Sequence, residues 1–488
     1  MSMFREALQP FDKLPIYELL TEEGLEKIHQ ATMKVLQEGG IAFHDPEALK
    51  ILKTNGAKVE GEMVYFGAEI IEEFVAKAPE TFTQIARNPD RSVQIGGEAV
   101  TFAPVYGPPF AFDLENGRRS STIQDFENFV KLAYLSPYIH HSGGTIVEPN
   151  DLPVNSRHLD MLLSHIVYSD KPFMGSVTSP QNAADSVEIV RRLFGAQAIQ
   201  ENPALLSLIN VNSPRQFDET MLKALRVYAE ARQAVIITPF IMAGSMAPIT
   251  LAGALTQQNA EALAGIVYTQ MVNPGAPVVY GSYLSTVDMK TGAPVFGSPE
   301  SQVALYASAQ IARYYKLPFR SGGTYTTSKL TDAQSAYEAM MTMIPTTLAR
   351  VNFVLHAAGW LESGMTAGYE KFILDCDVLG MMQKFYKGID LSEEEFGMDA
   401  LFEVEPGGHY LGTDHTMRNF RTAFYQTDIM DYNDYTQWDM EGRKDSVQLA
   451  NERVKDLLAS YESPPLDEGK KDAVESFIAR RKQELETN

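Results

Sequence analysis

The 488-residue sequence contains a single cysteine, Cys376, and only two tryptophans. One cysteine excludes an intrachain disulfide and a thiolate metal cluster, because each of these needs at least two sulfur atoms. Cys376 lies in KFILDCDVLG, with Phe372 and Leu379 at helical spacing on the same side. This pattern indicates a small buried apolar side chain rather than a reactive thiol.

The sequence also lacks long hydrophobic runs. Its longest apolar segments have the length of β-strands, so we expect no membrane-spanning helix. The first residues, MSMFREALQPFDKL, contain no basic segment followed by an apolar core, as a secretory signal would. Because hydrophobic residues make up 44% and charged residues 21%, we expect an ordinary globular protein with a cytoplasmic location.

Positive charge is scarce. Lysine and arginine number 41 against 63 aspartates and glutamates, which gives a net charge of -22. Such a chain repels phosphate backbones, and no basic stripe interrupts the acidic surface, so nucleic-acid binding is not expected. The same field favours a cationic substrate.

From residue 101 onward, short apolar segments alternate with amphipathic helices. Strands are predicted at 101–107, 139–145, 171–177, 204–210, 234–240, 277–283, 318–324 and 353–359. Helices are predicted to begin near Thr122, Ser156, Asn182, Asp218, Thr256, Ser298, Thr331 and Ala367. Apolar and polar residues do not alternate strictly along these strands, which is typical of parallel strands that are covered on both faces. Eight strand–helix units predict a (β/α)8 TIM barrel, although a count of seven or nine units stays open.

Two extensions flank the predicted barrel at 101–388. Residues 1–100 are expected to form an α/β extension with helices at 21–37, 46–54 and 67–77 and a hairpin of 81–86 with 91–96. Residues 389–488 are expected to form a mostly helical extension, with helices at 446–459 and 471–484, that packs on the barrel.

Aromatic and polar side chains gather where the predicted strands end, which is where reactive groups of such a barrel lie. No strand ends in aspartate or glutamate, which argues against a magnesium site and against a glycosidase pair. Converging aromatic rings suit a quaternary ammonium group, which has no N–H to donate and is held by ring faces. The sequence therefore favours a cationic methylated ligand.

Some strand-end residues have competing interpretations. His356 is the strongest histidine candidate, because its strand is otherwise apolar and ends there. The segment SGGT (321–324) is compatible with a phosphate-binding loop, which such barrels often place after their last strands. Arg320 is either an internal charge of the barrel or an anchor for a substrate carboxylate.

Five stretches of the chain resemble one known family, the trimethylamine methyltransferase superfamily of corrinoid-dependent enzymes. They are 238–267, 277–300, 327–338, HAAGWLESG at 356–364 and GGHYLGTDHT at 407–416. The resemblance covers most of the chain and implies a (β/α)8 barrel. Trimethylamine-specific members carry pyrrolysine inside the barrel, whereas ordinary residues fill the matching segment 322–327. The chain is therefore similar to the non-pyrrolysine branch, whose members act on quaternary amines such as glycine betaine.

The resemblance implies a methyltransferase that moves a methyl group from a quaternary amine, with glycine betaine favoured, to the Co(I) centre of a separate corrinoid protein. A quaternary nitrogen departs as a neutral tertiary amine, so the reaction needs neither a proton nor a metal on this chain. The cobalamin is expected on the partner protein, because the DxHxxG-type motif of corrinoid domains is absent here. A homo-oligomer is compatible with the sequence.

The strand-end residues and this chemistry together lead to a hypothesis about the roles of individual residues. His356 is the catalytic candidate, and the substrate-binding candidates are Tyr106, Phe110, Asn210, Arg320, Tyr325, Gln334, Trp360 and Glu362. Tyr106, Phe110 and Tyr325 are expected to surround the trimethylammonium group together with His356. Arg320, Asn210 or Gln334 is expected to hold a carboxylate, and Trp360 and Glu362 to shape the loop under the corrinoid partner.

Three alternatives stay open at this point. The same chemistry on carnitine or proline betaine fits the residues equally well. A barrel lyase or isomerase acting on a phosphorylated substrate would need a cationic phosphate pocket. A betaine-binding protein without catalytic activity would bind the same ligand and transfer no methyl group.

Overall fold

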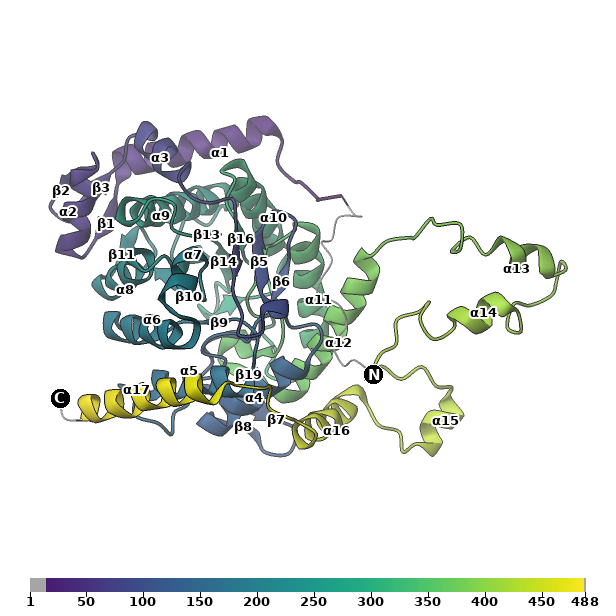
Figure 1. Ribbon diagram of the computed structural model, residues 1–488. Coiled ribbons are helices and arrows are strands. Elements are labelled where there is room, and N and C mark those ends of the chain that lie inside the picture. Colours follow the sequence, from purple (N-terminus) through teal and green to yellow (C-terminus); the bar gives the residue numbers. More distant parts are fainter. Residues whose placement is uncertain (1–14, 487–488) are drawn as a thin grey trace.

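The computed structural model describes residues 15–486 and has a central set of parallel strands surrounded by helices (Figure 1). The first fourteen residues, on which the expectation about a secretory signal rests, lie outside the described part. Seven strands pair in parallel in the order β9, β10, β12, β13, β16, β17 and β6. Their bounds are β6 Thr101–Phe102, β9 Phe173–Met174, β10 Leu205–Val211, β12 Ala234–Ala243, β13 Val278–Gly281, β16 Phe319–Arg320 and β17 Phe353–Val354. Each lies within or overlaps a predicted strand.

The remaining predicted strand, 139–145, is not a regular strand. Its backbone still bonds to both neighbours. The N–H of His140 donates to the Phe102 carbonyl of β6 (2.9 Å), and the N–H of Met174 in β9 donates to the Gly143 carbonyl (2.8 Å). Gly143 has a φ of 89°, a conformation that interrupts an extended ladder. The segment thus lies where a strand was predicted, but its glycine turns the backbone out of strand geometry.

The strands are buried on both faces. In β10, Leu206 and Leu208 pack in an apolar cluster that includes Ile236 and Phe353 of neighbouring strands. The alternate residue Ile209 belongs to the larger cluster formed with the surrounding helices. Both faces therefore need apolar side chains, and the strands appear in the sequence as continuous apolar runs.

The helices between the strands begin close to their predicted starts. Their bounds are α4 Ile123–Leu135, α5 Arg157–Tyr168, α6 Pro180–Phe194, α7 Ala196–Glu201, α8 Glu219–Glu230, α9 Leu251–Val272, α10 Pro299–Tyr314, α11 Ala333–Leu348 and α12 Tyr369–Tyr386. Thr122 and Ser298 are N-caps whose hydroxyl groups accept a backbone N–H of the first turn. The prediction was wrong for α9, which begins five residues before Thr256 because Thr250 occupies the N-cap position.

The N-terminal part covers one helix of the central body. Helices α1 Glu22–Lys34, α2 Pro46–Thr54 and α3 Ala68–Val75 pack on α9, and a short π-helix, Val35–Gly39, follows α1. A four-stranded sheet pairs β1 Ile41–Phe43, β2 Lys58–Glu60 and β3 Met63–Tyr65 with β11 Gln216–Phe217. Because α9 lies between these elements and the strands, it is buried almost all round.

The predicted hairpin is present as β4 Thr81–Gln84 and β5 Val93–Gly96. The Gln84 side-chain amide donates to the Phe173 carbonyl (2.9 Å) and to the Ala204 carbonyl (3.1 Å), at the N-terminal ends of β9 and β10. Ile95 packs into the apolar cluster between the strands. The hairpin therefore covers the N-terminal ends of the strands, and their C-terminal ends are left for a site.

Small strands that were not predicted lie beyond the C-terminal ends of the central strands. One sheet has the order β18, β19, β7, β8, with bounds β7 Phe110–Asp113, β8 Gly117–Ser120, β18 Trp360–Leu361 and β19 Thr366–Gly368. Strands β14 Tyr283–Val287 and β15 Pro294–Val295 form a second group, in which β14 pairs with the end of β12. These short segments bring the loops after β13 and β17 into fixed positions.

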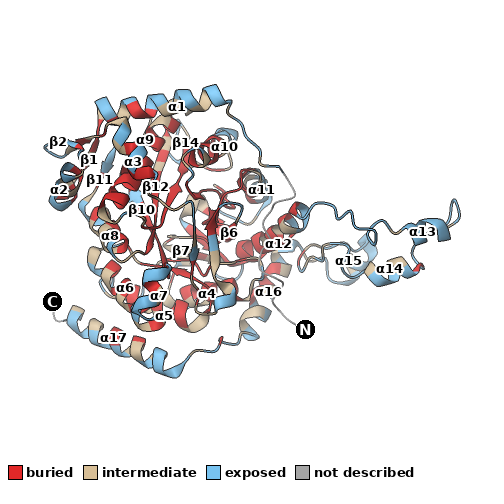
Figure 2. Cartoon of the chain, turned by 45° about the horizontal axis from the view of Figure 1, so that its top comes forward, coloured by how far each residue is buried: buried red, intermediate tan, exposed pale blue. Residues whose placement is uncertain are grey.

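The C-terminal part divides into two packed helices and a projecting arm (Figures 1 and 2). Helix α16, Ser446–Ala459, packs on α12 and α4, and α17, Glu468–Glu486, packs on α6. Residues 388–445, called the arm below, extend away from the body and contain α13 Met398–Glu403, α14 Asp414–Asn419 and α15 Tyr435–Met440. The arm departs from the expectation that the whole of 389–488 packs on the barrel.

None of the helices within residues 15–486 combines the length and the apolar character that crossing a membrane requires.

Candidate functional site

Five rings meet beyond the C-terminal ends of β13, β16 and β17. This aromatic cluster consists of Tyr283, Phe296, Tyr325, His356 and Trp360, and each of the five is at most 8% exposed. The His356 and Trp360 ring centroids are 4.6 Å apart, and those of Tyr325 and Trp360 are 4.9 Å apart. Tyr283 and Phe296 lie 5.4 and 5.5 Å from Tyr325. The rings come from four separate segments of the chain and present one continuous aromatic wall.

The backbone around His356 fixes the position of its ring. His356 has a φ of 73°, and its Nδ1 accepts the backbone N–H of Tyr106 (3.1 Å). A Cβ at Gly323 would lie 2.6 Å from the His356 carbonyl oxygen, so only glycine permits this approach of the two loops. The N–H of Thr324 donates to the same carbonyl (2.9 Å). The loops after β16 and β17 are therefore joined directly behind the rings.

A buried carboxylate on α12 holds both loops. One oxygen of Asp375 accepts the Thr324 hydroxyl (2.8 Å) and the Gly359 N–H (2.9 Å). Its other oxygen pairs with Lys371, which lies one turn earlier on the same helix and is 2% exposed at its side chain. Thr324 and Gly359 directly precede Tyr325 and Trp360, so Asp375 sets the positions of two rings.

A second carboxylate, Glu338 on α11, holds the next residues of the first loop. It accepts the Thr326 hydroxyl (2.6 Å), the Thr327 N–H (2.7 Å) and the Thr327 hydroxyl (2.8 Å). The Thr326 carbonyl in turn accepts the indole N–H of Trp360 (3.1 Å). These bonds keep the pKa of Glu338 below its ordinary value, although desolvation opposes them, and they favour the ionised form.

Arg320 lies buried beside the aromatic cluster with few partners. Arg320 is 1% exposed, and its Cζ lies 5.7 Å from the Tyr283 ring centroid. Among the described residues its Nε has no hydrogen-bond partner, and Nη1 lies 3.5 Å from the Ser282 carbonyl oxygen. A buried guanidinium without a carboxylate is costly, so the position is suited to an anionic group of a ligand.

The histidine at the site is neutral at ordinary pH. Burial, and then the nearby charge of Arg320, lowers the pKa of His356 well below its usual value. Burial likewise raises the pKa of Tyr325 to about 12, against a smaller opposing effect of Arg320. The aromatic cluster therefore carries no charge of its own near neutral pH, and Arg320 supplies the local charge.

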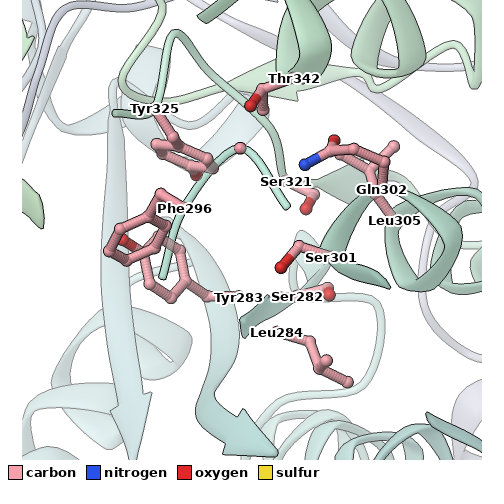
Figure 3. Close-up of a pocket in the computed structure, with 11 residues that line it drawn as sticks. Ser282, Tyr283, Leu284, Phe296, Ser301, Gln302, Leu305, Ser321, Tyr325 and Thr342 are labelled. Atoms are coloured by element: carbon pink, nitrogen blue, oxygen red, sulfur yellow. The ribbon is translucent and has the colours of Figure 1, made fainter. Parts of the chain in front are cut away.

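A small cavity adjoins the cluster (Figure 3). Its wall is aromatic on the side of Tyr283, Phe296 and Tyr325. Its opposite wall is largely polar and includes Ser282, Ser301, Gln302, Ser321 and Thr342. The free volume is about 20 Å³, enough for one or two water molecules. A larger ligand would require the two walls to move apart.

The structure brings five of the predicted site residues together. Arg320, Tyr325, His356 and Trp360 form or adjoin the cluster, and Tyr106 is linked to it by its hydrogen bond to His356. Burial, and then the charge of Glu148, raises the pKa of Tyr106 to about 12. All five were chosen because they stand at the ends of predicted strands.

The other predicted residues lie in different surroundings. The Phe110 ring lies under Arg118, with 3.6 Å from Cζ to the ring centroid, and Glu362 accepts the Nε–H of Arg118 (2.7 Å). Asn210 is exposed at the end of β10. Gln334 is exposed on α11, and its amide donates to Thr327 (3.0 Å) and to Glu338 (2.9 Å).

Four residues of the site were missed or left unassigned. Tyr283 stood among the predicted strand ends but received no role. Phe296 lies in GAPVFGSPE, where an aromatic among glycines and prolines before a helix is the only signal. Asp375 and Glu338 lie inside helices, and nothing local indicates that their carboxylates reach the loops after the strands.

Among the described residues, no three or more histidine, cysteine, aspartate or glutamate side chains are grouped so that they could hold a metal ion.

Comparison with known proteins identifies the family. The family model described as trimethylamine methyltransferase (MTTB) matches residues 3–486. The chain belongs to this family. The family predicted from the five sequence stretches is thereby confirmed, and the chain is a member of a methyltransferase family over nearly its full length.

Relatives of known activity cover the chain almost completely. The glycine betaine methyltransferase of Desulfitobacterium hafniense is 47% identical over 473 residues, which cover 97% of this chain and 98% of the relative. The proline betaine:corrinoid methyltransferase of Eubacterium limosum is 31% identical, and the alignment covers 93% of this chain and 96% of that relative. The trimethylamine methyltransferase of Methanosarcina thermophila is 29% identical, with 92% and 94% covered.

A solved structure shares the fold. The monomethylamine methyltransferase of Methanosarcina barkeri aligns with a TM-score of 0.51 at 11% identity. The alignment covers 93% of this chain and 90% of the other chain. At this identity the comparison concerns the α/β fold alone.

The buried histidines of this family member predict a dependence of stability on pH. Burial lowers the pKa of His165 to about 4 and that of His140 to about 3. Unfolded histidine titrates near 6.5, so the unfolded state binds more protons between about pH 4 and 6.5. The free energy of unfolding is therefore expected to fall below pH 6.5, by about 1.4 kcal/mol per pH unit for each such histidine. Urea unfolding at pH 7.5, 6.0 and 5.0 measures this.

A variant separates this effect from general acid destabilisation. The Nδ1 of His165 bonds to the Ser142 hydroxyl (2.7 Å) and its Nε2 to the Gly144 carbonyl (2.8 Å), two bonds that a glutamine amide is able to replace. His165→Gln is expected to reduce the slope of stability with pH. A wild-type protein with equal stability at pH 7.5 and 5.0 contradicts the prediction.

Proposed function

We propose that the chain transfers a methyl group from a quaternary amine, with glycine betaine favoured, to the Co(I) centre of a separate corrinoid protein. The observation that supports this proposal is the buried aromatic cluster beside Arg320, whose Nε has no hydrogen-bond partner within residues 15–486. Glycine betaine has a trimethylammonium group and a carboxylate one carbon apart. The cluster suits its cationic end, and Arg320 suits its anionic end. The family and the 47% identical glycine betaine methyltransferase support the same substrate class.

The neutrality of the site favours departure of the amine. A quaternary nitrogen loses its charge in the transition state, so a cage of anionic groups would stabilise the bound cation more than the transition state. Uncharged rings hold the cation by roughly 0.5–2 kcal/mol each, which positions the methyl group without trapping it. His356 is neutral and needs to move no proton, so we assign it to the cage, and its ring lies 4.6 Å from that of Trp360.

The corrinoid partner supplies the nucleophile, the reduced cobalt, and acts as a second substrate of this chain. Trp360 and Glu362 remain our candidates for the loop beneath it. The Phe110 and Arg118 pair joins Glu362 to β7, so this group forms one side of the loop. We keep Asn210 and Gln334 as secondary candidates for carboxylate contacts. We infer that this chain itself carries no cofactor and works in the cytoplasm, where the partner's cobalt is kept reduced.

The fold that supports this function is, we infer, a closed (β/α)8 barrel at 101–388, with extensions at 1–100 and 389–488. The parallel order from β9 to β6 and the hydrogen bonds of segment 140–143 to both end strands support closure. The substrate would enter from the C-terminal ends of the strands. Because the cavity is small, binding requires the loops that carry Phe296 and Tyr325 to separate.

A phosphate-binding loop at 321–324 is a weaker alternative. The N–H of Thr324 already donates to the His356 carbonyl, and the Gly323 backbone lies against that carbonyl oxygen. A phosphate oxygen would meet a carbonyl oxygen there. The same contacts leave the quaternary-amine site intact.

The direct test incubates the full-length protein with glycine betaine and its corrinoid partner in the Co(I) state. We expect the Co(I) absorption to be replaced by that of the methylated corrinoid, with release of one dimethylglycine per methyl group. Carnitine and proline betaine serve as competing substrates, and trimethylamine as the control without a quaternary nitrogen. If binding of glycine betaine is seen by calorimetry but no methyl group moves, the protein is a betaine-binding protein. No reaction and no binding for all of the quaternary amines overturns the proposal.

A further inference from the structure

Four residues form a row across the inner faces of adjacent strands, near their C-terminal ends. Asn210 of β10 pairs with Thr238 of β12, and Gly281 of β13 pairs with Arg320 of β16. A Cβ built on Gly281 would lie 2.1 Å from the Thr238 hydroxyl oxygen, so these two residues are neighbours as well. Ile236, two positions before Thr238, packs in the apolar cluster between the strands, which places the row on the inner face. These four residues are called the polar row.

Two members of the polar row have buried polar atoms that nothing satisfies. Thr238 is 2% exposed and Arg320 is 1% exposed. Across the part of the chain that the structure describes, neither the Thr238 hydroxyl oxygen nor the Arg320 Nε has a hydrogen-bond partner. Protein interiors rarely contain such atoms, because burying an unbonded polar group is costly. Both groups are able to donate a hydrogen bond, so the ligand group that satisfies them is an acceptor, and the guanidinium favours an anionic one.

Gly281 allows the threonine hydroxyl to approach the arginine. The hydroxyl oxygen lies where a side chain on Gly281 would begin, and therefore over β13. Because neighbouring strands are about 4.8 Å apart, this oxygen is one strand away from Arg320 on β16. A larger residue at position 281 would stand between the two donors. The glycine thus lets the hydroxyl and the guanidinium reach one small anionic group.

Aromatic rings lie one step further along the same strands. Phe240 follows Thr238 by two residues and Tyr283 follows Gly281 by two, so all four lie on the inner face. The ring centroids of Phe240 and Tyr283 are 5.0 Å apart, and the Arg320 Cζ lies 5.7 Å from the Tyr283 centroid. The donors and the rings are therefore close enough for one small zwitterion to contact both.

The inner face is open to solvent at the β10 end of the polar row. Asn210 is exposed, and Phe240 is partly exposed. The other end of the row, at Arg320, is buried. The two unsatisfied donors therefore lie at the closed end of a site that opens on the side of β10.

We propose that the Thr238 hydroxyl and the Arg320 guanidinium together hold the carboxylate of the substrate, and that Gly281 provides the room for it. This inference rests on the proposed function and adds to it a second carboxylate donor and a bound orientation. The carboxylate points toward the strands and the trimethylammonium group toward the rings. The methyl groups then face the C-terminal ends of the strands, where the corrinoid partner approaches.

Thr238→Val tests the hydroxyl, because valine keeps the shape of the side chain and removes only the oxygen. A hydrogen bond to a charged group is lost, so the dissociation constant for glycine betaine is expected to rise about tenfold or more. Calorimetry on the full-length protein measures it. Tetramethylammonium, which has no carboxylate, is expected to bind as it does to the wild type. Thr238→Ser keeps a hydroxyl and is expected to recover most of the affinity.

Two further measurements separate this role from a structural one. The free energy of unfolding of Thr238→Val is expected to equal or exceed that of the wild type, because a methyl group replaces an unbonded buried hydroxyl. The matched control Ser207→Ala removes a hydroxyl that is also fully buried. Ser207 lies between Leu206 and Leu208 of the inner cluster and so faces outward from β10. This control is expected to bind glycine betaine as the wild type does.

A double-mutant cycle tests whether the two donors share one carboxylate. The loss of affinity in Thr238→Val/Arg320→Met is then expected to be smaller than the product of the two single losses. Losses that multiply would assign the side chains to different groups and overturn the inference. Unchanged glycine betaine binding in Thr238→Val, or equal losses for both ligands, also overturns it and leaves the proposed function standing. A wild-type protein that binds no quaternary amine overturns both.

Discussion

Arg320→Met is expected to weaken glycine betaine binding and to lower kcat/KM for it by about 30-fold or more, since truncating one partner of a buried charged pair costs about 2–5 kcal/mol. The guanidinium lies at the aromatic cluster, and its Nε has no partner in the described part of the chain. In the complex it would pair with the substrate carboxylate. Methionine keeps much of the side-chain volume. Because an under-partnered buried charge is removed, the free energy of unfolding is expected to stay equal or to rise.

The choice of ligand separates this role from a structural one. Tetramethylammonium has the cationic group of glycine betaine and no carboxylate. Its dissociation constant, measured by calorimetry, is expected to change little in Arg320→Met. The matched variant Phe296→Leu, which removes one ring of the cluster, is expected to weaken both ligands. Equal losses for both ligands in Arg320→Met would mean that the arginine maintains the cavity rather than the carboxylate.

Asp375→Asn is expected to lower the free energy of unfolding by about 3–5 kcal/mol, because it leaves the buried Lys371 ammonium group without its counter-charge. The same carboxylate accepts the Thr324 hydroxyl and the Gly359 N–H, which fix the loops carrying Tyr325 and Trp360. Methyl transfer is therefore expected to decline as well, in protein that is still folded at low temperature. Urea unfolding and the corrinoid assay measure the two effects.

A double variant distinguishes the ion pair from the loop contacts. Lys371→Met/Asp375→Leu removes both charges from the interior, and most of the lost stability is expected to return. The Gly359 N–H still lacks its acceptor, and the Thr324 hydroxyl keeps only its longer bond to the His356 carbonyl (3.3 Å), so methyl transfer is expected to stay low. Recovery of full activity in the double variant would contradict the assignment of Asp375 as a positioning residue.

The sequence by itself was sufficient for the family, for most helix starts and for the segments that form the central strands. Strand segments are apolar on both faces, and their helices begin at residues such as Thr122 and Ser298, so local chemistry marks both. It also selected Arg320, Tyr325, His356 and Trp360, because the carboxyl ends of parallel strands meet at one end of the fold.

Only the tertiary structure decided which of these side chains meet and what holds them. Phe110 was expected in the cage and Glu362 in the loop under the corrinoid partner, yet both lie around Arg118. Glu338 and Asp375 accept hydrogen bonds from loop residues that are 11 to 51 positions away in the sequence, and Phe296 contacts the still more distant Trp360 ring. No local pattern encodes such contacts. Likewise, apolar residues in the arm look like core residues in sequence. Whether such residues are buried depends on how the chain folds around them, and here the arm leaves them exposed.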